Sequence, residues 1–301
     1  MKFRSLKGVN LIRPDGPRGP LALATLALPV LMVLACGCAR RPRTSSLRVD
    51  VIAHLWWWEF RYPGFSIVTC GDLHVPAGRP VSLTLWVGDD SRILAEPTPT
   101  RCFWVPALGA LSYVIPGSRQ HFVLRGNTPG EYEGRCLQFC GAGHANMRFR
   151  VFVDPPARFD AWMRHQEQTP VVPADDGEVG RGAQMFAGGL CTTCHTVAGV
   201  SKGSFGPNLT HFGSRSMIAG TLKNTSINLK RWIQKPYKVK PGAHMPTLGL
   251  RGARLDCCAS IISFDRDNHF CRSSPGLGPS VSAPIFAPDQ GSGQDPQRVL
   301  T

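Results

Sequence analysis

The sequence predicts a β-sandwich or β-barrel followed by a helical domain, with an apolar segment ahead of both. Between residues 46 and 155, apolar and polar residues alternate in short runs that Pro-Gly and Pro-Ala-Gly turns separate. Two stretches between residues 177 and 264 instead carry apolar residues at helical spacing. A Pro-rich, acidic stretch without periodicity lies within residues 156–176 and indicates a linker between the two domains.

Composition narrows the class of protein. A chain of 301 residues with 43% hydrophobic and 18% charged residues fits globular domains rather than a disordered chain. The net charge of +14 is dispersed, so no nucleic-acid surface is predicted; it suits ordinary solvation, or docking to an acidic electron donor or anionic lipid. The 11 cysteines fall into separate small groups, which favours metal and cofactor chemistry over a disulfide scaffold.

The first 45 residues are typical of an export or membrane segment. Basic residues precede an apolar run from Leu21 to about Cys38, and Arg40-Arg41-Pro42-Arg43 follows it. The run is near the lower length limit for a membrane-spanning helix, and it also fits a signal peptide or a lipoprotein cleavage site. All three interpretations export the rest of the chain.

Strands are expected through the first domain. Residues 47–51 and 81–85 alternate apolar with polar side chains, and the segments about Phe122 and Tyr132 continue the pattern. A last strand places Met147 and Val153 on one face, with the alternate residues between them. Short strands with such turns predict an antiparallel sandwich or barrel.

Four side chains that suit copper fall within twelve positions just before or at this last strand. They are Cys136, Cys140, His144 and Met147. Soft sulfur ligands with an imidazole suit copper, and the thiolate is the species that binds it. A disulfide, with the His and the Met as packing residues, is the alternative in an exported protein. Four such ligands rarely coincide at fixed spacing, so the sequence predicts a copper site on a loop held by a sheet.

The motif Cys191-Thr192-Thr193-Cys194-His195 is the attachment motif of a c-type haem. Cys191 and Cys194 would form thioether links to the porphyrin, and His195 would become an axial ligand of the iron. A redox cysteine pair or half of a zinc site is the alternative. One predicted helix, with Val179 and Phe186 on one face, leads into the motif, and a later helix ends at Pro236.

Met245 is the predicted second axial ligand. Pro241, Gly242 and Pro246 surround it and favour a loop rather than a helix. A thioether ligand raises the reduction potential of a haem, as electron transfer from a mild donor requires. Met217 and His211 are the alternative ligands. A buried methionine is also more often a core residue than a ligand.

These motifs resemble subunit II of the haem-copper oxidases, and in particular cytochrome c oxidase subunit II of the caa type, which carries a fused cytochrome c domain. The resemblance covers roughly residues 47–256, and besides the ligand motifs it rests on the segments Trp56–Pro63, Leu73–Val81, Phe103–Gly109, Pro129–Tyr132, Gly206–Arg215 and Trp232–Pro236. It implies a cupredoxin fold for residues 46–155, an all-α cytochrome c domain for residues 177–264, and Met245 as haem ligand.

The resemblance implies the electron-entry subunit of a terminal oxidase. Haem c would take electrons from a donor such as a cytochrome c or a respiratory complex. A dinuclear copper-A centre would follow, held by the four loop ligands and the backbone carbonyl of Gln138. Catalytic subunit I would then reduce oxygen, and in the family the aromatic stretch corresponding to Trp56–Trp58 lies near the copper and helps to pass electrons on. The apolar segment would be a transmembrane anchor that leaves the other domains on the periplasmic or outer face of the cell membrane.

The sequence departs from the family near the copper ligands. Arg101 stands where the family supplies a further His ligand, and an arginine stays protonated and cannot ligate. Cys102, His74 and His121 are the candidate substitutes. Gln138 replaces a Glu whose carboxylate contacts magnesium in the family, and an Asp is likewise usual where Tyr113 stands.

Two further segments depart from the family. Trp86–Thr100 is longer than the family pattern, and the segment 255–264 only partly fits the apolar helix that closes the haem domain. The tail, residues 265–301, is rich in Pro, Gly and Ser from Ser273 onward and is predicted to be disordered. An altered reading frame would explain both the tail and the long segment, and resequencing the coding DNA tests this.

Two other functions remain open. The first is a monohaem cytochrome with an empty, structural cupredoxin-like domain in which Cys136 and Cys140 form a disulfide; Arg101 favours it. The second is a copper-delivery protein, which would expose sulfur ligands but have little use for a covalent haem.

Overall fold

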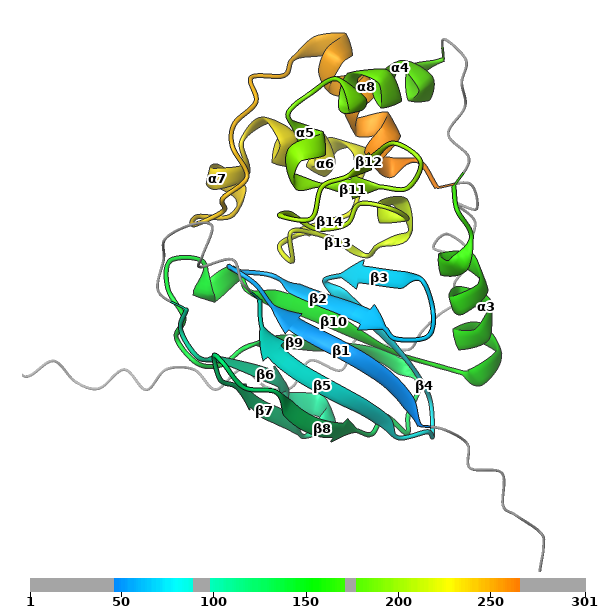
Figure 1. The fold of residues 1–301 in the computed structure, drawn as a ribbon, viewed down its shortest axis with the longest axis vertical. Helices are drawn as coiled ribbons and strands as arrows, with labels where there is room; N and C mark the ends of the chain where they lie inside the picture. Colours follow the sequence, from blue (N-terminus) through cyan, green and yellow to red (C-terminus); the bar gives the residue numbers. More distant parts are fainter. Residues whose placement is uncertain (1–45, 89–97, 171–176, 266–301) are drawn as a thin grey trace, which may run out of the picture. The chain divides into compact units, whose positions relative to one another are not determined.

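The computed structural model describes residues 46–88, 98–170 and 177–265 (Figure 1). The predicted anchor, most of Trp86–Thr100 and the tail beyond Asp265 lie outside these residues. Within the described part, no helix combines the length and the apolar character that crossing a membrane requires.

Two five-stranded sheets form the first half of the described chain (Figure 1). One has the order β3-β2-β1-β5-β8 and the other the order β4-β10-β9-β6-β7. The strands are β1 (Leu47–Ala53), β2 (Trp58–Tyr62), β3 (Ile67–Cys70), β4 (Asp72–Pro76), β5 (Val81–Val87), β6 (Arg101–Val105), β7 (Ala110–Val114), β8 (Gln120–Leu124), β9 (Gly130–Cys136) and β10 (Arg148–Asp154). The predicted β-rich first half is confirmed.

The pairing is not wholly antiparallel, which corrects the prediction of an antiparallel sandwich or barrel. β1 pairs with β5 in parallel, and β4 pairs with β10 in parallel. Alternation along a strand reports which face is buried but not the direction of its neighbour, so the sequence pattern did not reveal these two pairs.

A single apolar core fills this half. Along β5 the buried residues alternate as expected, and Val81, Leu83 and Leu85 are each at most 1% exposed. Trp58 packs edge-on against Phe103, with ring centroids 5.7 Å apart. Burying each such side chain contributes about 1.5–3 kcal/mol, so this core holds the two sheets as a rigid support for the loops at their edge.

Helix α3 (Pro156–Glu167) occupies the first part of the predicted linker. Its buried residues Phe159, Trp162 and Met163 join the core of the sheets. His74 stacks on Trp162 with ring centroids 4.3 Å apart, and its Nδ1 lies 2.7 Å from Asp154 Oδ2. This part of the segment is therefore a packed helix, and residues 171–176 lie outside the described chain.

The second half is mainly helical, with a core of its own around Phe186, Leu229, Ile233 and Ile262. Its helices are α4 (Glu178–Ala187), α5 (Cys191–Cys194), α6 (Ser226–Gln234), α7 (Pro236–Val239) and α8 (Gly252–Ser263). Two short hairpins interrupt them, β11 (Thr196–Val197) with β12 (Ser201–Lys202), and β13 (Met217–Ile218) with β14 (Leu222–Lys223). This half is therefore not made of helices alone.

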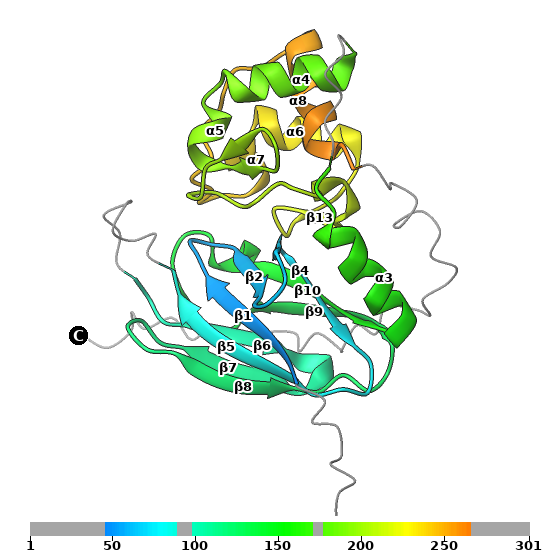
Figure 2. The same ribbon diagram turned by 45° about the vertical axis from the view of Figure 1, so that its right-hand side comes forward.

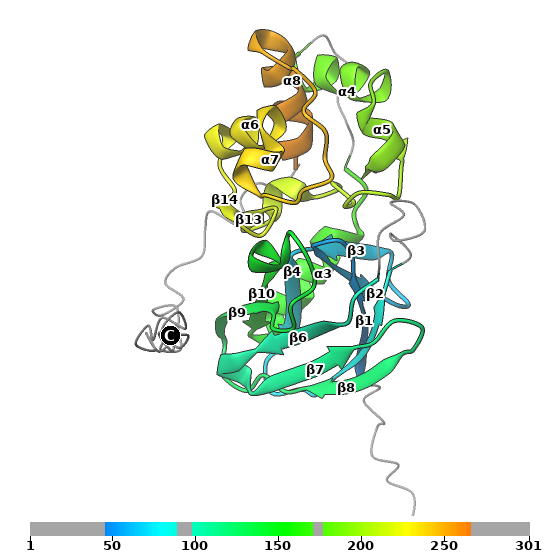
Figure 3. The same ribbon diagram turned by 90° about the vertical axis from the view of Figure 1, so that its left-hand side faces the viewer.

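Helix α8 forms from the segment that fits a helix only partly by sequence. It runs beside α4 (Figures 2 and 3) and buries Leu255, Cys257 and Ile261. The two helices touch at Gly182, where an added Cβ would lie 2.1 Å from the Cys257 carbonyl oxygen. Glycine at this position therefore permits the close approach of α8.

Candidate metal centres

The loop between β9 and β10 brings the four predicted copper ligands together. Cys136 ends β9 and Met147 directly precedes β10, while Cys140 and His144 lie between them. Cys140 Sγ lies 3.7 Å from Cys136 Sγ, 3.5 Å from His144 Nδ1 and 3.8 Å from Met147 Sδ. The Cys136 amide donates to the Met147 carbonyl at 3.0 Å, so the paired strands hold both ends of the loop.

A fifth donor and an aromatic support complete this loop. Cys136 Sγ lies 3.1 Å from the carbonyl oxygen of Gln138. The indole Nε1 of Trp56 donates to the Cys140 carbonyl at 2.7 Å. An added Cβ at Gly143 would lie 2.6 Å from a Trp56 ring atom, so the glycine lets the loop rest directly on the indole. The resemblance implies that this aromatic stretch lies near the copper, but the hydrogen bond from Trp56 to the Cys140 carbonyl was not predicted.

The two sulfur atoms are a thiol pair rather than a disulfide, because 3.7 Å far exceeds the S–S bond length of about 2.05 Å. The hydrogen bond between them lowers the pKa of Cys136 to about 6 and raises the pKa of Cys140. One thiolate thus forms readily. Two soft sulfur atoms, a thioether, an imidazole and a carbonyl within contact distance form a donor set that fits copper.

Arg101 is 1% exposed in β6 and lies close enough to the thiol pair for its charge to lower the pKa of Cys140 against the larger opposing effects. Its guanidinium donates to the backbone carbonyls of Pro99 and His54. The position at which the resemblance implies a His ligand is therefore filled by a cation anchored on the backbone. Compared with the ligand set that the resemblance implies, the arginine removes one ligand.

The three candidate substitutes for the missing His ligand lie in different parts of the first half. His74 bonds Asp154 beside α3, and His121 is exposed on β8 beside Thr84. Cys102 is buried in β6, and its carbonyl accepts from the Leu137 amide at 3.1 Å. Burial raises the pKa of the Cys102 thiol, and the charge of Cys136 adds to this effect. Among the described residues, Cys136, Cys140 and His144 group as potential ligands without any of the three substitutes.

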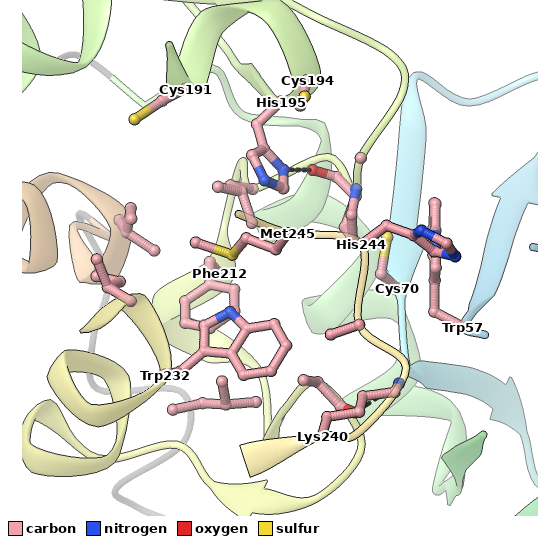
Figure 4. A pocket seen from close by; sticks show the side chains of 18 of the residues that line it. Trp57, Cys70, Cys191, Cys194, His195, Phe212, Trp232, Lys240, His244 and Met245 are labelled. Atoms are coloured by element: carbon pink, nitrogen blue, oxygen red, sulfur yellow. Dashed lines mark hydrogen bonds between the residues drawn. The ribbon is translucent and has the colours of Figure 1, made fainter. Parts of the chain in front are cut away.

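The predicted haem residues line one pocket, whose wall also includes Trp57 and Cys70 of the first half (Figure 4). Cys191 and Cys194 lie on α5, His195 follows directly, and Met245 lies on the loop after α7. Phe186, Phe212, Leu229, Trp232, Ile233 and Ile262 supply much of the apolar lining. A mostly apolar cavity with two thiols, an imidazole and a thioether on its walls suits a covalently attached haem.

His195 is oriented as a metal ligand. Its Nδ1 donates to the Pro207 carbonyl at 2.8 Å (Figure 4), which leaves the lone pair on Nε2. Burial lowers the pKa of His195, so the imidazole is neutral and able to ligate. An added Cβ at Gly206 would lie 2.6 Å from Cε1 of this ring, so the neighbouring glycine is part of the arrangement.

Gly206→Ala is expected to lower the free energy of unfolding of the second half by about 1–3 kcal/mol, because the methyl group would displace the His195 ring or the loop. Thermal unfolding followed by circular dichroism measures this. Gly188→Ala is the matched control: its Cβ meets its nearest atom at 3.4 Å, and its φ of −86° suits any residue. Equal stability of the two variants would contradict the prediction.

The two alternative axial ligands also differ in place. Met217 lines the same pocket from β13. His211 is engaged elsewhere: its Nε2 lies 2.8 Å from the Gln168 carbonyl oxygen and its Nδ1 lies 3.2 Å from Asp265 Oδ1. Met217 is therefore the one alternative that shares the pocket with Met245.

Two residues of the segment that leads to Met245 contact Trp56, on which the β9–β10 loop rests. His244 stacks on Trp56, with ring centroids 5.2 Å apart and an angle of 12° between the rings. Lys240 Nζ donates to the carbonyls of Trp56 at 2.8 Å and Ala219 at 3.0 Å, and burial lowers the pKa of Lys240 to about 8. Neither contact was predicted, because no local sequence pattern marks a Lys or a His as a residue with a buried partner.

No protein-family model matches the chain. Individual known proteins do match it and show its family. The chain is 32% identical to cytochrome c oxidase subunit 2 of Alkalihalophilus pseudofirmus over 202 residues, which is 67% of this chain and 56% of the relative. It is 31% identical to the same subunit of Bacillus sp. strain PS3 over 242 residues, 75% of this chain and 65% of the relative. The chain belongs to the cytochrome c oxidase subunit II family.

This subunit II chain spans between about half and two thirds of the length of these relatives. A shorter match, 33% identical over 123 residues and 41% of this chain, is quinol oxidase subunit 2 of Bacillus cereus, where it covers 39% of the relative. Among solved structures, the periplasmic domain of subunit II of cytochrome oxidase of Bradyrhizobium japonicum is 19% identical, with a TM-score of 0.36 over 40% of this chain and 92% of that chain.

Proposed function

We propose that this chain is the electron-entry subunit of a haem-copper terminal oxidase. Haem c, attached to Cys191 and Cys194, would receive electrons from a donor. Copper held by the β9–β10 loop would receive them next, and a catalytic subunit would use them to reduce oxygen. The observation that carries the proposal is the meeting of Cys136, Cys140, His144 and Met147 around one point, with distances of 3.5–3.8 Å from Cys140 Sγ.

The loop residues would keep the copper geometry constant as its charge changes. Bound copper supplies one-electron redox chemistry. The thiolates of Cys136 and Cys140 would hold the copper and offset its charge, and the carbonyl of Gln138 would add a harder donor. Since β9 and β10 fix both ends of the loop, little rearrangement would accompany electron transfer.

The haem residues would hold the iron between a nitrogen and a sulfur atom. The Pro207 carbonyl keeps Nδ1 of His195 protonated and turns Nε2 toward the pocket. Met245, on the pocket wall, would supply the thioether that raises the reduction potential. A bound haem supplies reversible electron transfer, and the apolar lining would exclude water from it.

The aromatic contact at Trp56 would join the two centres. Its indole bonds the Cys140 carbonyl and stacks on His244, the neighbour of Met245. The chain's own residues thus supply a continuous packed connection between the two ligand sets. The proposed partners are catalytic subunit I, an acidic electron donor that suits the net charge of +14, and the cell membrane, with the described domains on its periplasmic or outer face.

Arg101 favours a second candidate, a monohaem electron-transfer cytochrome whose first domain is empty of copper. The arginine replaces a ligand with a cation beside the thiols. In this case the thiol pair would be structural, and electrons would leave through the haem alone.

The copper and iron content of the purified full chain after copper loading tests the two candidates. We expect about two copper ions per haem iron, and a paramagnetic resonance spectrum of one unpaired electron shared by both coppers. Haem iron without copper would contradict the first candidate and leave the monohaem cytochrome. Copper without haem would instead contradict both.

A further inference from the structure

His165, His211 and Asp265 meet in the described chain at a place that the proposed electron transfer does not use. His165 lies on α3, His211 directly precedes the 3₁₀ turn Phe212–Ser214, and Asp265 follows α8. Their potential ligand atoms all lie within 4.8 Å of one another. Each of the three side chains is at most 6% exposed.

The hydrogen bonds of His211 determine where its protons lie. Its Nε2 is 2.8 Å from the Gln168 carbonyl oxygen, which can only accept, so Nε2 carries a proton. Its Nδ1 is 3.2 Å from Asp265 Oδ1. If the ring is neutral, Nδ1 presents a lone pair to a carboxylate oxygen, and two acceptors then face each other. A positive species is therefore required between them, either a second ring proton or a metal ion.

The spacing of the three groups suits a metal ion. His165 Nε2 lies 3.1 Å from Oδ1 and 3.2 Å from Oδ2 of Asp265. Ligand atoms bound tetrahedrally to zinc at about 2.0–2.1 Å are roughly 3.3 Å apart, which is close to the His–Asp separations. Two imidazoles and a carboxylate form a donor set that zinc takes in proteins.

The carboxylate is in the ionised form that a metal binds. Burial by itself would raise the pKa of Asp265, but hydrogen bonds from His165 and His211 outweigh it and hold that pKa below its usual range. The low pKa is compatible with either species, because a proton or a metal ion on the histidines would keep Asp265 charged.

The backbone conformation at His211 and Gly213 allows the three side chains to come together. His211 has a φ of 56°, in the left-handed region that is uncommon for a residue other than glycine. At Gly213, an added Cβ would lie 2.4 Å from the Ser263 carbonyl oxygen and 3.0 Å from Asp265 Cβ. The left-handed turn and the glycine together let the end of α8 approach the ring of His211.

We propose that His165, His211 and Asp265 form a three-ligand site for a zinc ion, which ties α3 to the end of α8 and leaves a fourth coordination position for water. This inference does not depend on the proposed redox function. It assigns a use to His211, a residue that sequence analysis considered only as an alternative haem ligand.

Zinc uptake by the full chain tests the site. The wild type and Asp265→Asn are freed of labile metal with a chelator, dialysed against zinc, and analysed for zinc per chain by mass spectrometry. We expect Asp265→Asn to hold about one zinc ion fewer per chain, since loss of one of three ligands weakens binding by at least about tenfold. Zinc should also raise the unfolding temperature of the wild type more than that of the variant.

Asp256→Asn is the matched control. Asp256 lies on α8, the helix that precedes Asp265, in a partly exposed ion pair with Lys230 at 2.6 Å. Its variant should take up as much zinc as the wild type. His165→Gln and His211→Gln, compared by their circular dichroism, provide the same test if Asp265→Asn does not fold. Equal zinc uptake by the wild type and every folded site variant would overturn the proposal and mean that a proton lies between His211 and Asp265.

Discussion

The chain carrying Cys140→Ser is expected to bind no copper while keeping its covalently attached haem. Cys140 Sγ is the atom nearest to the three other ligands, and a serine hydroxyl stays protonated and is a hard donor. Removing this thiolate should weaken copper binding by at least about 100-fold. Copper per chain after loading, with the haem absorption spectrum of the same sample, measures both effects.

Cys102→Ser is the matched control for this experiment. Cys102 is an equally buried thiol on the neighbouring strand β6, and it lies outside the group of ligand atoms formed by Cys136, Cys140 and His144. The Cys102→Ser variant should therefore bind as much copper as the wild type. Loss of copper in this variant would mean that Cys102 replaces the ligand missing at Arg101, whereas full copper binding by Cys140→Ser would contradict the proposed site itself.

Met245→His is expected to lower the reduction potential of the haem by roughly a few tenths of a volt, because axial ligands set haem potentials over a range of about 0.8 V. An imidazole donates more strongly to ferric iron than a thioether does, so the oxidised form gains stability. Spectroscopic redox titration of the purified chain measures the midpoint. Such a fall would slow electron donation from a mild donor and leave the copper content unchanged.

Met217→Leu is the control for the second ligand. Met217 lines the same pocket from β13, and leucine has a similar volume, so the potential should stay the same if Met217 is only a wall residue. A large change in this variant together with no change in Met245→His would exchange the roles of the two methionines. The pair of variants therefore decides which sulfur ligates the iron.

The sequence by itself determined the features that depend on short spacing. The positions of Cys136, Cys140, His144 and Met147 along twelve residues were enough to predict a shared site, because the ends of two paired strands bring such a loop together. The Cys191–His195 motif likewise predicted three neighbouring haem-binding residues from spacing alone. Alternation likewise predicted the strands β1, β5 and β10.

Tertiary structure alone decided the contacts between distant segments. Trp56 lies 84 residues from Cys140, and His211 lies 54 residues from Asp265, so no local pattern could pair them. The parallel strand pairs and the packing of α8 against Gly182 also depend on how whole elements pack. The physical reason is the same in each case: spacing along the chain fixes neighbours within one turn or strand, whereas burial of apolar surface determines which distant elements meet.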